Sequence, residues 1–411
     1  MRYIKENLAS IKLLTGIIIG GLLGVFFGEK MMVVEPIGQL FLNFLFMILV
    51  PLVFFSVSSS IANMEGGKRL GKIMLYTMLV FIMTAMISAI IAYLGVRIYP
   101  LIDSNHFNVE SVIEQLGEVT IQKDLSMADR IVGMLSVEDF QGLFSKNNML
   151  AVIIFSIIVG LATLNTSVDN TTFKDFLNAG NTMIMKVVDY IMYLAPIGLG
   201  CYFASSIGQL GSQLINGYAR TMLLYCLISI IYFFGVMTFY AFIANGKTGI
   251  KDFWANITTP ALTAIATCSS AASIPVNIEF TKKMNVADDI AETVIPLGAN
   301  THKDGSVIGG VFKIAFLFVL FGRDITTIEN IIAIIFGGFF VGLVMGSIPG
   351  GGAIAETMIA VFFGFPTETV PLIMIISTII DIPATLLNSA GNTVSAMMVQ
   401  SLIERSERKK K

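Results

Sequence analysis

Two short segments in the second half of the chain place polar and charged residues inside otherwise apolar sequence. Residues 298–306 have the sequence GANTHKDGS, and residues 381–392 have the sequence DIPATLLNSAGN. The most conspicuous side chains are Lys303, Asp304 and Asp381. If these segments lie in a membrane, such ionisable residues are costly and usually mark a site or pathway for an ion or solute.

The polar residues of the second segment recur at the spacing of one helix face. Asp381, Thr385, Asn388 and Asn392 stand at positions i, i+4, i+7 and i+11. A polar stripe of this kind must face protein or water, because lipid cannot satisfy it. Binding a solute is one role for the stripe, and holding neighbouring helices together is another.

The first segment is too rich in glycine and polar groups to remain helical, so we expect the backbone to unwind there. Carbonyl oxygens exposed around Gly298 and Asn300, together with the Asp304 carboxylate, would then offer ligands to a small cation or hydrogen bonds to a solute. The alternative is that Asp304 and Lys303 form an ion pair that only stabilises the structure. Lys313 and Glu356 could likewise be satisfied internal charges.

The composition shows what must surround these segments. The chain has 411 residues, of which 55% are hydrophobic and 13% charged, and its mean hydropathy is +0.81. A soluble domain usually carries about a quarter charged residues. The net charge of −2 gives no basic surface for nucleic acid, and the three cysteines provide no disulfide framework or transition-metal motif. The composition therefore predicts an integral membrane protein.

The elements that position the two segments are apolar helices. A spanning helix needs about 20 apolar residues. Runs of this kind occupy residues 12–29, 38–63, 71–100, 148–163, 183–208 and 220–244. The first run carries Gly16, Gly20, Gly24 and Gly28 one turn apart, a pattern that suits close helix packing.

Charged loops indicate the orientation. Basic residues gather at both termini, around residues 68–72 and around residues 247–283, whereas residues 101–147 are predominantly acidic. The positive-inside rule places the basic segments in the cytoplasm and the acidic loop outside. Both termini are therefore predicted to be cytoplasmic, with an even number of crossings.

The second half contains two interrupted apolar segments. Residues 250–280 and 326–366 each have two apolar arms joined by a Ser-rich or Gly-rich tip, and residues 286–322 form a crossing between them. Such tips are tolerated at membrane depth only when protein or a wet cavity surrounds them. We therefore predict an all-α polytopic membrane protein with eight transmembrane helices and two oppositely oriented re-entrant hairpins related by an inverted repeat, the last helix being 367–404.

Several motifs resemble those of the dicarboxylate/amino acid:cation symporter family, which includes glutamate and neutral amino acid transporters. The resemblance covers nearly the whole chain. The motifs that carry it are FLFMILVPLVF at 44–54, LAPIG at 194–198, SSAASIP at 269–275, PLGA at 296–299 with Asp304-Gly305-Ser306, and IPGGG at 348–352.

The resemblance implies an organisation as well as a fold. It implies a homotrimer in the cell membrane, a scaffold and trimerisation domain made mainly of residues 1–245, and a transport domain made mainly of residues 246–411. The third span would contribute to the transport domain, which slides across the bilayer with a small-molecule substrate. It implies no cofactor beyond Na⁺ or H⁺ as the coupling ion.

The resemblance also assigns roles. Asp381 matches the family aspartate that holds the substrate's amino group, Asn388 with Thr385 beside it matches the residue that contacts the α-carboxylate, and Ser306 lies near the substrate side chain. The two hairpin tips are matched by Ser269 and Ser270 and by Gly351 and Gly352. Asp304 matches a sodium-site aspartate, with Thr84 as a companion.

The chain departs from the family pattern at the cation sites. His302 and Lys303 stand where the family has asparagine and methionine, and Asn392 replaces an aspartate of another sodium site. Our hypothesis is that Lys303 or His302 takes the place of a bound cation, which would give proton-coupled or sodium-poor transport. Gly310 stands where potassium-coupled members have a glutamate, so no potassium coupling is expected.

The cargo depends on an arginine that acidic-substrate members use. Its position is Ala384 here, and the alternative position is Cys268, so no guanidinium fork is available for a side-chain carboxylate. Because Asp381 remains, we favour a small neutral amino acid. If Lys303 instead pairs with a second carboxylate, the cargo would be aspartate, glutamate or a dicarboxylate.

The sequence argues against two other classes of protein. An anion channel would leave the two opposed hairpins and the amine-binding aspartate unexplained. An enzyme would need a metal triad or a nucleophile–base pair, and the sequence offers neither.

Overall fold

The chain is helical throughout its described part. The computed structural model describes residues 8–63, 68–102, 136–145, 148–166, 171–210, 212–344 and 351–408. In the first half the helices are α2 (Leu8–Phe27), η1 (Gly28–Val34), α3 (Glu35–Ala62), α4 (Lys68–Ile98), α7 (Phe140–Leu143), α8 (Met149–Thr166), α9 (Thr172–Met192), α10 (Ala195–Leu210) and α11 (Ser212–Ile231). In the second half they are the π-helix η3 (Tyr232–Val236), α12 (Met237–Asn256), α13 (Thr258–Thr267), α14 (Ile274–Lys283), α15 (Asp288–Thr301), α16 (Asp304–Leu320), α17 (Ile328–Val344), α18 (Gly351–Phe363), η4 (Thr367–Thr369) and α19 (Val370–Arg408).

Several of these helices are suited to a membrane. Within the described ranges, four segments are long and apolar enough to cross one, namely residues 15–41, 71–98, 215–256 and 367–408. A fifth would be the bent pair formed by α9 and α10, whose axes differ by 53°. These segments are consistent with a polytopic membrane protein, while the predicted count of eight crossings stays a prediction. Most of the predicted acidic external loop, residues 103–135 and 146–147, lies outside the described residues.

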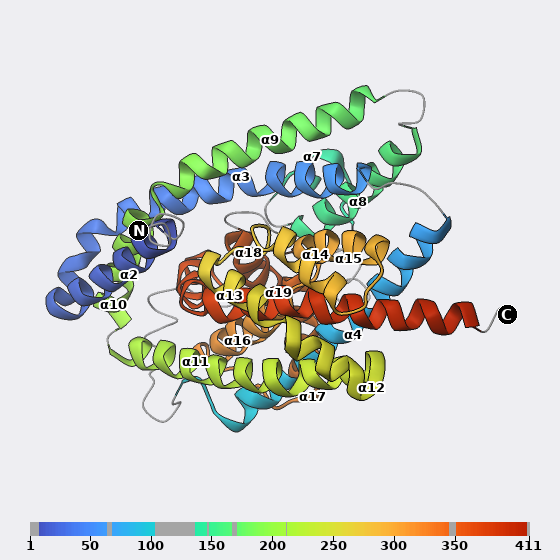
Figure 1. Cartoon of the computed structure of the whole chain (residues 1–411). Helices are drawn as coiled ribbons and strands as arrows, with labels where there is room; N and C mark the ends of the chain where they lie inside the picture. The colour runs from blue at the N-terminus through green and yellow to red at the C-terminus, as the bar shows by residue number, and fades with distance from the viewer. Residues whose placement is uncertain are drawn as a thin grey trace.

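The glycine row predicted for close packing lies against α10. A Cβ atom on Gly16 would lie 2.2 Å from the carbonyl oxygen of Pro196, and one on Gly20 would lie 2.1 Å from that of Gly200. Hydrogen at these positions therefore allows the two backbones to touch. Figure 1 shows α2 and α10 side by side at one end of the molecule.

Two of the predicted spans have different bounds in the structure. The predicted helix 183–208 is interrupted at Tyr193–Leu194, just before Pro196, because the proline cannot continue the α9 hydrogen-bond pattern. The predicted helix 220–244 extends at both ends, from α11 through η3 into α12, and α12 bends at Asn245–Gly246.

Helix α12 leads into the first predicted hairpin. The single tryptophan of the chain, Trp254, stacks on Phe234 with ring centroids 5.3 Å apart, and its indole N–H donates to Thr238 Oγ1 at 2.9 Å. The two ten-residue helices α13 and α14 follow and pack against each other and against α19. Cys268 ends α13 in the left-handed conformation, with φ of 47°.

The predicted crossing 286–322 is two helices rather than one. The predicted interruption is confirmed, but it is shorter than expected: only His302 and Lys303 leave the helical conformation. Gly298 and Asn300 stay within α15, and the carbonyl of Gly298 accepts the His302 N–H at 2.9 Å. Most of the carbonyl groups that unwinding would have exposed as ligands therefore remain in the hydrogen bonds of the helix.

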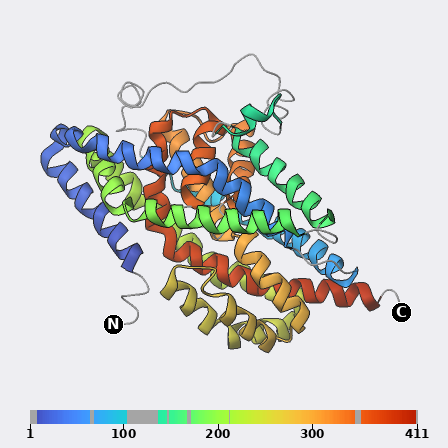
Figure 2. The ribbon, with the colours of Figure 1, turned by 90° about the horizontal axis from the view of Figure 1, so that it is seen from above.

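Helices α16 and α19 form the centre of the molecule. All residues of α16 from Asp304 to Phe318 are buried, which is typical of a helix enclosed by protein on every side. Helix α19, red in Figure 1, runs through the middle and contacts α4, α12, α13, α15 and α16. In Figure 2 the olive helices α12 and α13 lie along one side of α19.

The second predicted hairpin is described on both sides of its tip. Its arms are α17 and α18, which pack against each other. The tip, residues 345–350, lies outside the described residues, so Ile348-Pro349-Gly350 of the IPGGG motif receives no structural account.

Candidate functional site

The N-terminus of α16 lies directly against α19. A Cβ atom on Gly305 would lie 2.4 Å from the carbonyl oxygen of Ala384, so only glycine allows this approach. One turn further along, Asn388 Oδ1 accepts the Ser306 N–H and Asn388 Nδ2 donates to Ser306 Oγ, both at 3.2 Å. The Asn388 side chain thus caps α16, satisfying one of the N–H groups that the first turn of a helix leaves free.

Asp381 lies at the same end of α16. Thr385 stands one helical turn further along α19, and the Lys303 ammonium lies within electrostatic range of the Asp381 carboxylate without forming an ion pair. Tyr225 and Cys268 also lie within electrostatic range of Asp381. Residues from α11, α13, α16 and α19 therefore converge on one carboxylate.

His302 is the centre of a second polar cluster. Its Nδ1 lies 2.9 Å from Asn392 Oδ1, and its Nε2 lies 2.6 Å from Thr84 Oγ1 and 3.1 Å from Asp304 Oδ1. The Phe81 ring stacks on the imidazole with centroids 4.2 Å apart. The imidazole therefore links α4, α16 and α19 at the point where the α15–α16 segment breaks.

Asp304 is almost wholly enclosed. It is 1% exposed, and its Oδ2 accepts a hydrogen bond from Tyr232 at 2.9 Å. Its Oδ1 has His302 as its only close partner within the described part of the chain and makes no regular hydrogen bond there. The carboxylate is thus held by an imidazole and a phenol, both supplied by the protein.

The other predicted site residues lie on α15, in the turn between α13 and α14, and at the start of α18. Asn300 is exposed and donates to the Pro296 carbonyl of its own helix. Ser269 and Ser270 belong to the turn between α13 and α14, where Ser269 Oγ accepts the Ala272 N–H at 3.2 Å. Gly351 and Gly352 are the first residues of α18, beside the tip that lies outside the described residues. Gly298 lies against the cluster around His302, because a Cβ atom on Gly298 would lie 2.3 Å from Asn392 Oδ1.

A row of buried tyrosines on α11 and η3 is not among the residues predicted from the sequence. Tyr218 donates to the Leu372 carbonyl at 3.0 Å, Tyr225 to the Gly305 carbonyl at 2.7 Å, and Tyr232 to Asp304. Their regular spacing of seven residues, two helical turns, was the signal that could have found them. The π-helix begins at Tyr232, and the wider turn changes the direction of the side chains that follow.

Another buried cluster lies deeper along α16. Lys313 Nζ is 2.7 Å from Glu356 Oε1 and donates to Ser377 Oγ at 2.9 Å, while Ser377 in turn donates to Glu356. Both charged side chains are at most 1% exposed. The two charges therefore form one ion pair between α16 and α18 through Glu356 Oε1, whereas the buried Glu356 Oε2 has no hydrogen-bond partner within the described residues.

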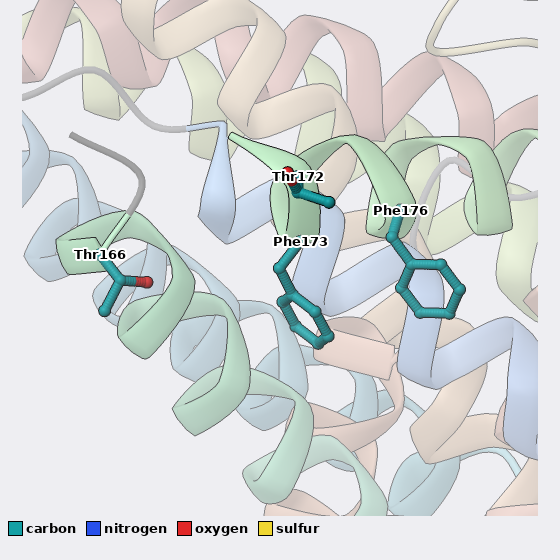
Figure 3. A pocket seen from close by; sticks show the side chains of 4 residues that line it. All are labelled: Thr166, Thr172, Phe173 and Phe176. Carbon is teal, nitrogen blue, oxygen red and sulfur yellow. The ribbon is translucent and has the colours of Figure 1, made fainter. Parts of the chain in front are cut away.

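A cavity in the described residues lies elsewhere. It has a volume of about 590 Å³ and is lined by Thr166, Thr172, Phe173 and Phe176. Figure 3 shows these side chains at the facing ends of α8 and α9. None of the predicted site residues lines it, and its two aromatic rings offer no group that would select a charged solute.

Comparisons with known proteins identify the family of the chain. A sequence model of the sodium:dicarboxylate symporter family matches residues 9–402. The chain is 26% identical to a proton/sodium-glutamate symport protein of Bacillus subtilis over 97% of this chain and 93% of that protein. It is 25% identical to a C4-dicarboxylate transport protein of Pseudomonas fluorescens over 96% and 88% of the two chains.

A third relative is the neutral amino acid transporter B(0) of Rattus norvegicus, which is 27% identical over 64% of this chain and 47% of that transporter. The chain thus spans about half the length of this relative. Since the family match covers nearly the whole sequence, the chain belongs to the sodium:dicarboxylate symporter family.

Proposed function

We propose that this protein is a secondary active transporter that moves a small amino acid across the cell membrane together with a coupling cation. The observation that carries the proposal is the burial of His302, Lys303 and Asp304 where α16 meets α19, with a half-buried Asp381 further along α19, inside an apolar helical protein. Buried ionisable residues in such a setting are functional by default, because their burial is otherwise unfavourable. Family membership supports the transport of a solute with a cation.

The proposed architecture has eight crossings and two opposed re-entrant hairpins. The hairpins are α13 with α14 and α17 with α18, and the short lengths of α13 and α14 support this assignment, since ten residues span only about 15 Å of a 30 Å hydrocarbon core. In this proposal residues 1–245 form the scaffold of a homotrimer and residues 246–411 the mobile domain. Contacts of α4 with α15, α16, α17 and α19 support its inclusion in the mobile domain.

The proposed cargo is a small neutral amino acid. Asp381 and Lys303 provide one negative and one positive group, while Thr385, Ser306 and Asn388 add neutral polar groups. Ala384 and Cys268 leave the site without a guanidinium. Acidic amino acids and dicarboxylates are the second candidate, which the names of the Bacillus and Pseudomonas relatives support.

The proposed coupling depends little on sodium. The Asp304 carboxylate, the predicted cation ligand, is already contacted by the His302 imidazole and the Tyr232 hydroxyl. Asn392 and Thr84 are likewise engaged by the two nitrogens of the imidazole ring. A ring that contacts three of the predicted ligands competes with a bound sodium ion for the same oxygen atoms. We therefore propose that proton-driven transport dominates.

The test is uptake into proteoliposomes of a labelled panel containing L-alanine, L-serine, L-aspartate and succinate. Uptake is measured with an imposed sodium gradient and, separately, with a proton gradient. We expect saturable uptake of alanine or serine driven by protons. In the His302→Asn variant, which restores the family residue, sodium should stimulate uptake at least about tenfold more than in the wild type, as expected if one oxygen ligand is freed.

Two outcomes would contradict this proposal in different ways. Passive, non-saturable flux of every solute would mean a channel rather than a transporter. Sodium-driven uptake by the wild type, with no change in His302→Asn, would mean that the imidazole does not compete with the coupling ion. Lys186→Met serves as the matched control, because Lys186 is exposed on α9.

A further inference from the structure

The second part of α12, residues 247–256, folds back against the first part. The backbone leaves the helical conformation at Asn245 and Gly246, and Gly246 has a φ of 59°, which glycine adopts without strain. A Cβ atom on Gly249 would lie 2.2 Å from the carbonyl oxygen of Ala241, so a glycine here allows the two parts to touch. Residues 247–256 are therefore a short folded-back segment and do not continue the membrane span.

The length of the preceding helix carries this bend beyond the apolar core of a membrane. Residues 212–244 form one nearly continuous helix through α11, η3 and the first part of α12, about 50 Å long at about 1.5 Å per residue. The hydrocarbon core of a bilayer is only about 30 Å thick. Since the basic segment 247–283 is predicted to be cytoplasmic, we expect the bend to lie among the headgroups of the cytoplasmic leaflet.

The folded-back segment is amphipathic. Phe253 is buried against the protein, whereas Lys247 and Lys251, one turn apart, are exposed on the other side of the helix. Trp254 stacks on Phe234, which is itself exposed on the apolar surface of η3. Lysines on the polar face and a tryptophan at its border are typical of a helix that lies in the membrane interface.

The two lysines keep their charges available for a partner outside the chain. Within the described ranges, no ion pair joins Lys247 or Lys251 to an acidic residue. The lysines of the neighbouring helix α14 differ, because Lys282 and Lys283 each form an ion pair with a glutamate, at 2.6 and 2.7 Å. The protein therefore pairs the basic residues of α14 and leaves those of the folded-back segment unpaired.

A third cation is held at the same bend. Arg405, near the end of α19, is exposed, and its Nη2 donates to the carbonyl oxygen of Ile243 at 3.2 Å. This bond fixes the position of the guanidinium without pairing its charge. The nearby carboxylates point elsewhere: Asp252 accepts a hydrogen bond from the turn after α14 at 2.9 Å, and Glu404 accepts one from its own helix at 2.6 Å.

We propose that Lys247, Lys251 and Arg405 form a binding surface for the anionic headgroups of phospholipids in the cytoplasmic leaflet. Basic residues close to a membrane surface attract such headgroups. The cations adjoin exposed apolar side chains on the first part of α12, among them Phe239 and Phe242, which acyl chains can cover. This combination fits a lipid better than a soluble anion. Because α13 follows directly, a bound headgroup anchors the base of the first predicted hairpin.

The test is native mass spectrometry of the full-length protein in a neutral detergent, titrated with phosphatidylglycerol or with phosphatidylcholine. We expect the wild type to bind phosphatidylglycerol at least about tenfold more tightly, since each basic residue near an anionic headgroup adds about fivefold in affinity. In Lys247→Gln/Lys251→Gln the affinity for phosphatidylglycerol should fall at least about tenfold, while that for phosphatidylcholine stays the same.

The matched control is Lys282→Gln/Lys283→Gln. It removes the same two charges at residues that already have glutamate partners, so it should keep the wild-type preference for phosphatidylglycerol. Equal losses in the two double variants would mean that the lipid responds to net charge and not to this surface. Equal affinities of the wild type for both lipids would also overturn the inference. Neither result concerns the cargo or the coupling ion, so the proposed function is tested separately.

Discussion

The Lys313–Glu356–Ser377 cluster shows how a single residue can stabilise three helices at once. Lys313 belongs to α16, Glu356 to α18 and Ser377 to α19, and the two charges are enclosed by protein. Breaking such a pair by removing one partner leaves the other charge buried without compensation. The cluster therefore holds α18, an arm of the second predicted hairpin, against the central helices.

The first prediction concerns this pair. Glu356→Gln or Lys313→Met should each lower the free energy of unfolding by about 3 to 5 kcal/mol, because one buried charge loses its partner. The double variant Lys313→Met/Glu356→Leu should lose much less, since an apolar pair of similar volume needs no compensation. Apparent melting temperatures in one detergent measure all three variants. Equal losses in the double and single variants would show that the pair is not coupled.

At the scale of single residues, the sequence predicted which residues belong to the site better than it predicted the contacts between them. The polar face of α19 and the importance of Lys303, Asp304 and His302 follow from the cost of placing such groups in an apolar protein. The family resemblance placed Thr84 beside Asp304, but its contact with the His302 imidazole could not be predicted, because the two residues are 218 positions apart and no local pattern links them. Tyr232 was missed because buried tyrosines usually indicate packing alone.

Among the elements, helix breaks illustrate what local sequence can and cannot predict. The interruption near Asp304 was predicted from glycine and polar residues, but its length was not. The Gly298 carbonyl keeps its partner, the His302 N–H, so the helix continues to Thr301 despite the polar sequence. The break at Tyr193–Leu194 was missed, although Pro196 follows it, because the apolar run continues through it.

The second prediction concerns the contact between α2 and α10. Gly20→Ala should lower the free energy of unfolding by about 1 to 3 kcal/mol, because the new methyl group would meet the Gly200 carbonyl and separate the helices. Gly71→Ala on α4 is the matched control, since a Cβ there meets no atom within 4 Å. The Gly71→Ala variant should gain up to about 1 kcal/mol in the free energy of unfolding, because alanine has a better helix propensity than glycine. Thermal unfolding of both variants measures the difference, and equal melting temperatures would exclude steric control by Gly20.

The whole molecule presents apolar side chains on many helices. Ile18, Phe26, Leu223, Phe234 and Ile328 are among those more than half exposed. In water such a surface would aggregate, whereas a bilayer covers it at no cost. Composition alone predicted this property, because 55% hydrophobic residues cannot all be enclosed in one protein of this size. The number of crossings is harder to predict, since interrupted helices and full spans share the same composition.

The third prediction concerns orientation. In a background with Cys201, Cys226 and Cys268 replaced by alanine, a cysteine at exposed Glu138 should react with a membrane-impermeant maleimide in intact cells. A cysteine at Arg408 should react only after the cells are permeabilised, because the positive-inside rule places that end in the cytoplasm. Labelling of both positions in intact cells would mean an even number of crossings between them and would contradict the predicted orientation.

The position of Trp254 gives the molecule an optical property of its own. This single indole stacks on Phe234 near the end of α12, four residues before α13 begins. Fluorescence excited at the indole band therefore comes from one place and needs no dye or engineered label. Any rearrangement of α12 against α13 that parts the indole from Phe234 will change its emission, so the protein reports the movement of that hairpin in its native sequence.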